Sequence, residues 1–271
     1  FTQQKNTAAD ASPTAGQMPR ALGLALASKL FRENTALHSN TAFSINGNEV
    51  CFATIGDAST SEGHFWETLN AATVMRVPLV VNVWDDGYGI SVPKKYQTTK
   101  ASISEALAGF EINEVGDGIL IYKVKGWDYP ALIEAYQDGV ARARNEHRPV
   151  LFHIEEVTQP QGHSTSGSHE RYKTKERLQW EREFDGIVKM KEWMLSNALA
   201  SEEALNQIEE EAKKEVLDAK QAAWNNYAQP IKTEMIELLN VYAAFEQHSV
   251  LGYFIQQETN SLKAIREPFR K

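Results

Sequence analysis

Hydrophobic residues follow two different periods along the chain. Continuous apolar runs, the pattern of strands that are buried on both faces, occupy residues 50–55, 78–83, 119–124 and 150–157. Between them, apolar residues recur at helical spacing over residues 65–76 and 129–145. Strands that alternate with helices in this way predict a parallel sheet with crossover helices. We therefore predict an α/β fold with a doubly wound, mostly parallel sheet and helices on both faces.

A further helix is predicted before the first strand, over residues 17–33. Four residues at helical spacing form its apolar stripe, namely Met18, Leu22, Leu26 and Leu30. Leu24 and Ala25 widen this stripe. We expect the helix to be buried on more than one side, as an interface helix would be.

The pattern changes after residue 157. Residues 158–169 are rich in Gly, Ser, His and Gln and show no periodicity, and every strong pattern after Lys173 is helical. We predict two domains: residues 1–184 form the α/β domain, and residues 185–271 form a helical extension and a linker.

The helical extension should contain two long helices. Ser201, followed by two acids, is typical of the N-cap of a charged amphipathic helix. We expect this helix to end near Tyr227, because Pro230 removes a backbone donor and breaks helices. A separate helix is predicted over residues 234–246, and the last 20 residues are expected to be a linker.

Composition and charge exclude several classes of protein. Of the 271 residues, 42% are apolar and 24% are charged, which is enough apolar material for a real core. The net charge of −8 argues against binding to nucleic acid or to an anionic membrane surface. No apolar stretch approaches the roughly 20 residues that span a bilayer. The single cysteine, Cys51, excludes an internal disulfide and is expected to be a buried small hydrophobe. We expect a cytoplasmic protein.

The first candidate site follows the first predicted strand and precedes a helix. It consists of Gly56, Asp57, Ala58 and Ser59. A turn of small residues at the carboxyl end of a strand exposes backbone N–H groups, and the helix start adds positive charge, which suits a phosphate. An acid beside a phosphate needs a bridging cation, and Mg²⁺ commonly binds one or two carboxylates together with phosphate oxygens. The alternative is that Asp57 only caps the helix.

A second acidic turn follows the next predicted strand, at Asp85, Asp86 and Tyr88. Between Ala58 and Asp85 lie 26 residues, which accommodate one strand, one helix and one strand. Both turns can then lie at the same edge of the sheet and share one metal ion. The alternative is a pair of solvated loop acids.

These residues resemble a known family. The sequences GDASTSEGHFWETLNAA, NVWDDGYGISVP and QPQGHSTSGSHERYKTKERLQWE, in this order, resemble the alpha subunit of the first, decarboxylating component of 2-oxo acid dehydrogenase complexes. The resemblance covers about two-thirds of the chain, from about Ser12 to Leu199. It implies a thiamine diphosphate-binding fold, with thiamine diphosphate and Mg²⁺ as cofactors.

The resemblance also implies roles for individual residues. Asp57, Asp86 and the carbonyl of Tyr88 would bind Mg²⁺. His163 would lie near the diphosphate and the reacting centre, as the catalytic residue, unless it is only a surface loop histidine. The remaining cofactor-binding positions would be Ser12, Thr14, Gly56, Ala58, Ser59 and Ile90.

The chain departs from the family pattern at several positions. An amide pair usually stands where Asp85 and Asp86 do, so the site would gain negative charge. Trp84 occupies a position where branched-chain relatives often carry an Arg, and two acids are replaced by Gly167 and Ser168. The segment that precedes Ser12 in relatives has no counterpart here, so we expect the chain to be a fragment of a longer protein.

Function follows from the resemblance. It implies oxidative decarboxylation of a 2-oxo acid, with transfer of the acyl group to a lipoyl carrier, and a branched-chain substrate is preferred. The activating glutamate of the family comes from a beta-type subunit, so this chain alone is expected to be inactive. Expected partners are that beta-type subunit or half, a lipoyl-bearing acyltransferase component and a second copy in a homo-oligomer. The alternatives are pyruvate dehydrogenase, another thiamine diphosphate enzyme such as a transketolase half, or a non-catalytic module that keeps the fold.

Overall fold

The computed structural model describes residues 13–163 and 168–265. The chain divides into two compact units, Phe1–Ser196 and Asn197–Lys271. The predicted domain boundary after residue 184 falls inside the first of these units.

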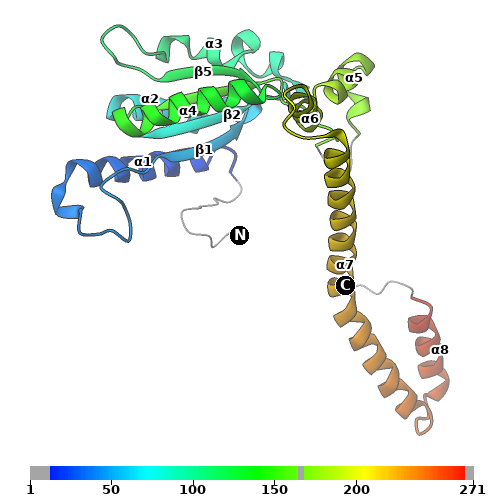
Figure 1. The fold of residues 1–271 in the computed structure, drawn as a ribbon. Coiled ribbons are helices and arrows are strands. Elements are labelled where there is room, and N and C mark those ends of the chain that lie inside the picture. Colours follow the sequence, from blue (N-terminus) through cyan, green and yellow to red (C-terminus); the bar gives the residue numbers. More distant parts are fainter. Residues whose placement is uncertain (1–12, 164–167, 266–271) are drawn as a thin grey trace. The chain divides into compact units, whose positions relative to one another are not determined.

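The first unit is built around a four-stranded parallel sheet (Figure 1). Its strands are β1 (Cys51–Gly56), β2 (Leu79–Trp84), β5 (Leu120–Lys125) and β6 (Val150–Glu155), in the spatial order β1-β2-β6-β5. Each strand lies within two residues of its predicted range. Five consecutive residues of β2 are buried, whereas burial alternates along β1, because β1 lies at the edge of the sheet.

Helices cover both faces of this sheet. On one face, the core joins β1 and β2 to α1 (Gln17–Glu33), α2 (Gly63–Met75) and the short α3 (Ile103–Ala106). On the other face, α4 (Tyr129–Glu146) packs on β5 and β6. A Cβ on Gly139 of α4 would lie 2.6 Å from the ring of Phe152, so the absence of a side chain there lets α4 lie close to the sheet. The predicted α/β class, with helices on both faces, is confirmed.

The buried face of α1 differs from the predicted stripe. Its fully buried residues are mostly small: Met18, Ala21, Ala25 and Ser28. Leu30 is 49% exposed and Leu24 is 52% exposed in the single chain, so neither belongs to its core, and burial of the helix on a second side stays a prediction. Small residues allow α1 to lie close to α2 and β1, which leaves these leucines on the outer surface.

Short elements complete the first unit. Beyond β2, two short strands, β3 (Tyr88–Gly89) and β4 (Val92–Pro93), form an antiparallel ribbon. After β6 come α5 (Lys175–Glu183) and α6 (Gly186–Ser196).

Up to residue 265, where its description ends, the second unit contains two helices, α7 (Glu202–Glu246) and α8 (Gly252–Lys263). The prediction that Pro230 ends the first helix was wrong, because α7 continues through it. Figure 1 shows that α7 changes direction along its length, as expected of a helix with an internal proline. The prediction of a linker over the last 20 residues was also wrong, since α8 lies there. α8 packs against α7.

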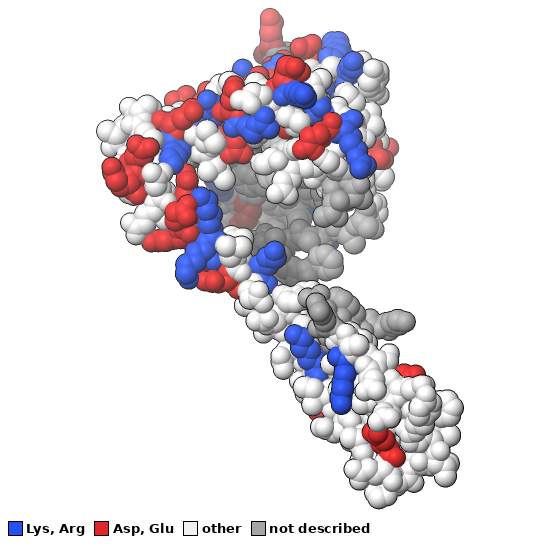
Figure 2. Space-filling model, turned by 90° about the vertical axis from the view of Figure 1, so that its right-hand side faces the viewer, with Lys and Arg blue, Asp and Glu red and all other residues white. Residues whose placement is uncertain are grey.

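Charged side chains of both signs are mixed over the face of the α/β unit seen in Figure 2. Over the described residues, no helix is long and apolar enough to cross a bilayer.

Candidate functional site

The two acidic turns lie side by side at the carboxyl edge of the sheet. Gly56 of β1 is in register with Trp84 of β2, and the amide of Asp57 donates a hydrogen bond to the carbonyl of Trp84 at 3.2 Å. Asp86 follows Trp84 by two residues. The crossover inferred from the 26-residue spacing is therefore confirmed, with α2 as its helix.

Asp57 has the chemistry of a cation ligand. Its residue is 5% exposed, and its Oδ2 atom is buried without a hydrogen-bond partner. Burial, together with the negative charges of Asp85 and Asp86, raises the pKa of Asp57 to about 7. Its side chain makes no capping hydrogen bond to the turn that follows. A buried carboxylate oxygen without a hydrogen-bond partner is available to a cation.

Asp85, in contrast, is already satisfied by its own chain. Its Oδ1 accepts a hydrogen bond from the amide of Gly87 at 2.9 Å. Its Oδ2 lies 2.7 Å from Nζ of Lys94 and 2.9 Å from Nε2 of His153. Burial would raise the pKa of Asp85, but the hydrogen bonds from His153 and Lys94 outweigh burial and lower it.

The acid pair still adds negative charge to the site, because the charges of both Asp85 and Asp86 contribute to the raised pKa of Asp57. Asp85 is paired with the ammonium of Lys94, which comes from the 3-10 turn Lys94–Tyr96 after β4.

Asp86 and Tyr88, both partly buried, belong to the same turn. The Oδ1 atom of Asp86 accepts a hydrogen bond from the amide of Tyr88 at 3.0 Å, which shapes the turn. Burial raises the pKa of Asp86. The carbonyl of Asp86 accepts a hydrogen bond from Arg177 of α5 at 2.8 Å.

The small-residue turn lies directly against β3. Ala58 and Ser59 form the start of the 3-10 turn η2 (Ala58–Ser61), which follows Gly56 and Asp57. A Cβ on Gly89 would lie 2.7 Å from Cβ of Ala58 and 2.5 Å from Oε1 of Gln97. Only glycine at this position lets the two turns approach each other so closely.

Ile90 is held in a strained backbone conformation. It opens the two-residue connection between β3 and β4 with φ of 58°, where hairpins of this kind favour glycine. Its side chain is 60% exposed. Strained residues cluster at functional sites, and here the strain lies next to the two acidic turns.

The structure gives less information on the remaining predicted residues. Thr14 is exposed in the turn before α1, and Gln17 of α1 donates to the carbonyl of Thr54 at 3.0 Å, near the carboxyl end of β1. Ser12 lies outside the described residues. His163 is exposed and stands directly before residues 164–167, which also lie outside the described part of the chain.

Several residues that shape the site were missed from the sequence. Besides Lys94 and Arg177, they include His153, whose Nδ1 lies 2.9 Å from Oγ of Ser104. A histidine inside the apolar run of residues 150–155 was a signal, because a buried polar side chain requires a partner.

Asp85, His153 and Glu155 each have an atom that could bind a metal ion, and these atoms lie within 4.8 Å of one another. This group is a poor metal site, because the ammonium of Lys94 contacts the oxygen of Asp85 that a cation would need.

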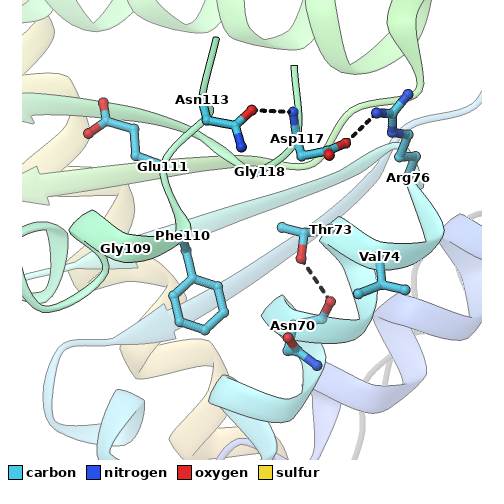
Figure 3. A pocket seen from close by; sticks show the side chains of 10 residues that line it. All are labelled: Asn70, Thr73, Val74, Arg76, Gly109, Phe110, Glu111, Asn113, Asp117 and Gly118. Carbon is cyan, nitrogen blue, oxygen red and sulfur yellow. Dashed lines mark hydrogen bonds and ion pairs between the residues drawn. The ribbon is translucent and has the colours of Figure 1, made fainter. Parts of the chain in front are cut away.

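A separate surface hollow of about 580 Å³ lies between the end of α2 and the segment that leads into β5 (Figure 3). Arg76 and Asp117 form an ion pair at its rim, and Asn113 accepts a hydrogen bond from the amide of Asp117. α2 ends here, just before β2 begins, so the hollow lies toward the amino ends of the strands. It is therefore distinct from the acidic turns.

Comparison with known proteins agrees with this geometry. Residues 2–232 match the family described as "Dehydrogenase E1 component". The chain is 29% identical over 218 residues to "Pyruvate dehydrogenase E1 component subunit alpha, somatic form, mitochondrial" of Pan troglodytes, covering 80% of this chain and 50% of that protein. It is 31% identical over 223 residues to "2-oxoisovalerate dehydrogenase subunit alpha 1, mitochondrial" of Arabidopsis thaliana, covering 81% of this chain and 42% of that protein.

The chain thus spans about half the length of these curated relatives, or less. The family match covers most of its residues, including both acidic turns. We conclude that the chain belongs to the dehydrogenase E1 component family.

Proposed function

We propose that this chain supplies the magnesium and diphosphate half of a thiamine diphosphate site. The site would serve oxidative decarboxylation of a 2-oxo acid, with transfer of the acyl group to a lipoyl carrier. The observation that carries the proposal is the unpartnered Oδ2 of Asp57, buried on a turn that adjoins the Asp86–Tyr88 turn.

The donor set fits Mg²⁺. Asp57, Asp86 and the carbonyl of Tyr88 would be its protein ligands, and oxygen donors of this type are those that Mg²⁺ prefers. Gly56, Ala58 and Ser59 would receive the diphosphate on backbone N–H groups, where the turn leads into α2. Thr14 and Ser12 would line the cofactor from the start of α1, and Ile90 from the β3–β4 connection.

When bound, thiamine diphosphate would supply the electron sink for decarboxylation. The protein's own groups would bind and orient it. Asp85, fixed by Lys94 and His153, would hold the turn that carries two of the metal ligands. His163 would act beside the diphosphate as the catalytic residue.

A beta-type partner would complete the site. No glutamate of this chain matches the activating glutamate of the family, and the apolar side chains of Trp84 and Ile90 stand 54% and 60% exposed beside the acidic turns. We therefore propose that the chain alone is inactive, and that it assembles with a beta-type subunit or half, with a second copy of itself and with a lipoyl-bearing acyltransferase. A cytoplasmic location stays a prediction.

A branched-chain 2-oxo acid is the preferred substrate in this proposal. The residues around Tyr88 and His163 are more like branched-chain relatives, whereas the overall identities to the pyruvate and 2-oxoisovalerate dehydrogenase subunits are similar. Dye reduction with branched-chain 2-oxo acids and with pyruvate, in the presence of the beta-type half, would separate the two substrates.

Calorimetric binding of thiamine diphosphate with Mg²⁺ tests the site itself. We expect the parent chain to bind and Asp57→Ala to lose binding. Asp117→Ala, which removes an exposed acid near the opposite end of the strands, is the matched control and should bind normally. With the beta-type half present, His163→Ala should lower turnover by orders of magnitude. A parent chain that does not bind the cofactor even with the beta-type half present would favour a non-catalytic module instead.

A further inference from the structure

Arg177 joins α5 to the turn that carries two of the proposed metal ligands. Its Nη2 atom donates to the carbonyl of Asp86 at 2.8 Å, and its Nε atom donates to Oε1 of Glu181 at 2.8 Å. Its guanidinium carbon lies 5.5 Å from the ring centre of Tyr88 and 4.6 Å from that of Trp180. One side chain therefore contacts both Asp86 and Tyr88.

The side chain of Arg177 contacts a buried ion pair between Glu181 and Lys173. The side chain of Glu181 is 3% exposed, and its two oxygens lie 2.7 and 3.0 Å from Nζ of the fully buried Lys173. Lys173 also lies 5.0 Å from the ring centre of Tyr88. Arg177 and Lys173 share the single carboxylate of Glu181, so together they present positive charge toward Asp86. Both cations act to lower the pKa of Asp86, although the effect of burial, which raises it, is larger.

The turn is thus held from two sides. On the sheet side, the carboxylate of Asp85 is fixed by Lys94 and His153. On the α5 side, Arg177 fixes the carbonyl of Asp86. Between these two attachments, the amides of Gly87 and Tyr88 donate to the carboxylates of Asp85 and Asp86.

We propose that Arg177 is a positioning residue that holds the Asp86–Tyr88 turn in the conformation that receives the metal and its diphosphate. This inference rests on the proposed function. A guanidinium is required, because its Nε and Nη2 atoms donate to two different elements at once, which the single nitrogen of a lysine cannot reproduce in the same geometry.

Two measurements on the full chain test this role. The first is hydrogen exchange of the Gly87 and Tyr88 amides without cofactor. The second is the dissociation constant for thiamine diphosphate at saturating Mg²⁺. The variants are Arg177→Gln and Arg177→Lys. The control is Arg182→Gln, which removes an exposed arginine of the same helix that contacts only Gln179 among the hydrogen bonds described for it.

We expect Arg177→Gln to speed exchange of both amides and to weaken cofactor binding, each by about tenfold, because the turn gains access to open conformations. Amides of β2 should be unchanged, which separates local loosening from unfolding. Arg177→Lys should resemble Arg177→Gln, and Arg182→Gln should resemble the parent.

Unchanged exchange and binding in Arg177→Gln would overturn the inference, as would full rescue by Arg177→Lys, which would show that charge alone matters. Parent protein that fails to bind the cofactor, even with the beta-type half present, would instead reject the proposed function, while the exchange data would still decide whether Arg177 holds the turn.

Discussion

Oδ2 of Asp85 lies 2.9 Å from Nε2 of His153, and both side chains are at most 2% exposed. The strands bring them together, because Val83, two residues before Asp85, is in register with His153 on β6. The acid next to the proposed ligand Asp86 is therefore part of the support of the site.

The first prediction concerns this pair. His153→Leu should lower the free energy of unfolding by about 2–4 kcal/mol, because it leaves a buried carboxylate with one partner fewer. Urea denaturation measures the change. His64→Leu, at an exposed position of α2, should change stability by less than about 0.5 kcal/mol. Equal midpoints for the two variants would contradict the supporting role of His153.

The second prediction concerns pH. The pKa of Asp57 is raised by burial from 3.8 to about 7, so in the folded chain this group keeps its proton to higher pH than in the unfolded chain. Between about pH 4 and 7 the unfolded state then binds fewer protons, and the stability of the metal-free chain should fall as the pH rises.

In the Asp57→Asn variant the side chain cannot ionise, so the stability of this variant should not fall between these pH values. At pH 8 without metal it should exceed the parent in stability by a few kcal/mol, up to about 4. Mg²⁺ with thiamine diphosphate should stabilise the parent and not the variant. Denaturant melts at several pH values provide the measurement, and parallel pH profiles of parent and variant would show that Asp57 is not the responsible group.

The third prediction concerns Gly89. Gly89→Ala places a Cβ within 2.7 Å of Ala58 and should push the two turns apart. We expect cofactor affinity to fall by tenfold or more, a change of about 1.4 kcal/mol per factor of ten. Gly63→Ala is the control, because a Cβ there meets nothing within 4 Å. Calorimetry that gives the same affinity for both variants would count against the close contact.

The fourth prediction concerns the second unit. Pro230 lies inside α7, where a proline costs up to about 3 kcal/mol relative to alanine. Pro230→Ala should therefore raise the temperature at which helical circular dichroism is lost, and Gln229→Ala should change it little. A lower melting temperature for Pro230→Ala would show that the packing of α8 on α7 needs the bend.

The sequence alone determined the parallel sheet and the position of the two acidic turns at one edge of it. Continuous apolar runs predicted the central strands. A half-buried strand needs apolar residues only at alternate positions, so continuous runs indicate a sheet that is covered on both faces. The spacing between Ala58 and Asp85 placed both acidic turns at one edge, since a single crossover fits that length.

The tertiary structure decided which polar groups meet. Asp85 has no free oxygen because Lys94 and His153 contact its carboxylate, and His153 comes from β6, far along the chain from Asp85. The tertiary structure also decided that Leu30 stays half exposed and that α7 passes through Pro230, because packing against neighbouring helices outweighs the local preference of a single residue. Local sequence patterns determine which segments form strands, helices and turns. The partners of a buried charge are determined only when separate strands and helices pack together.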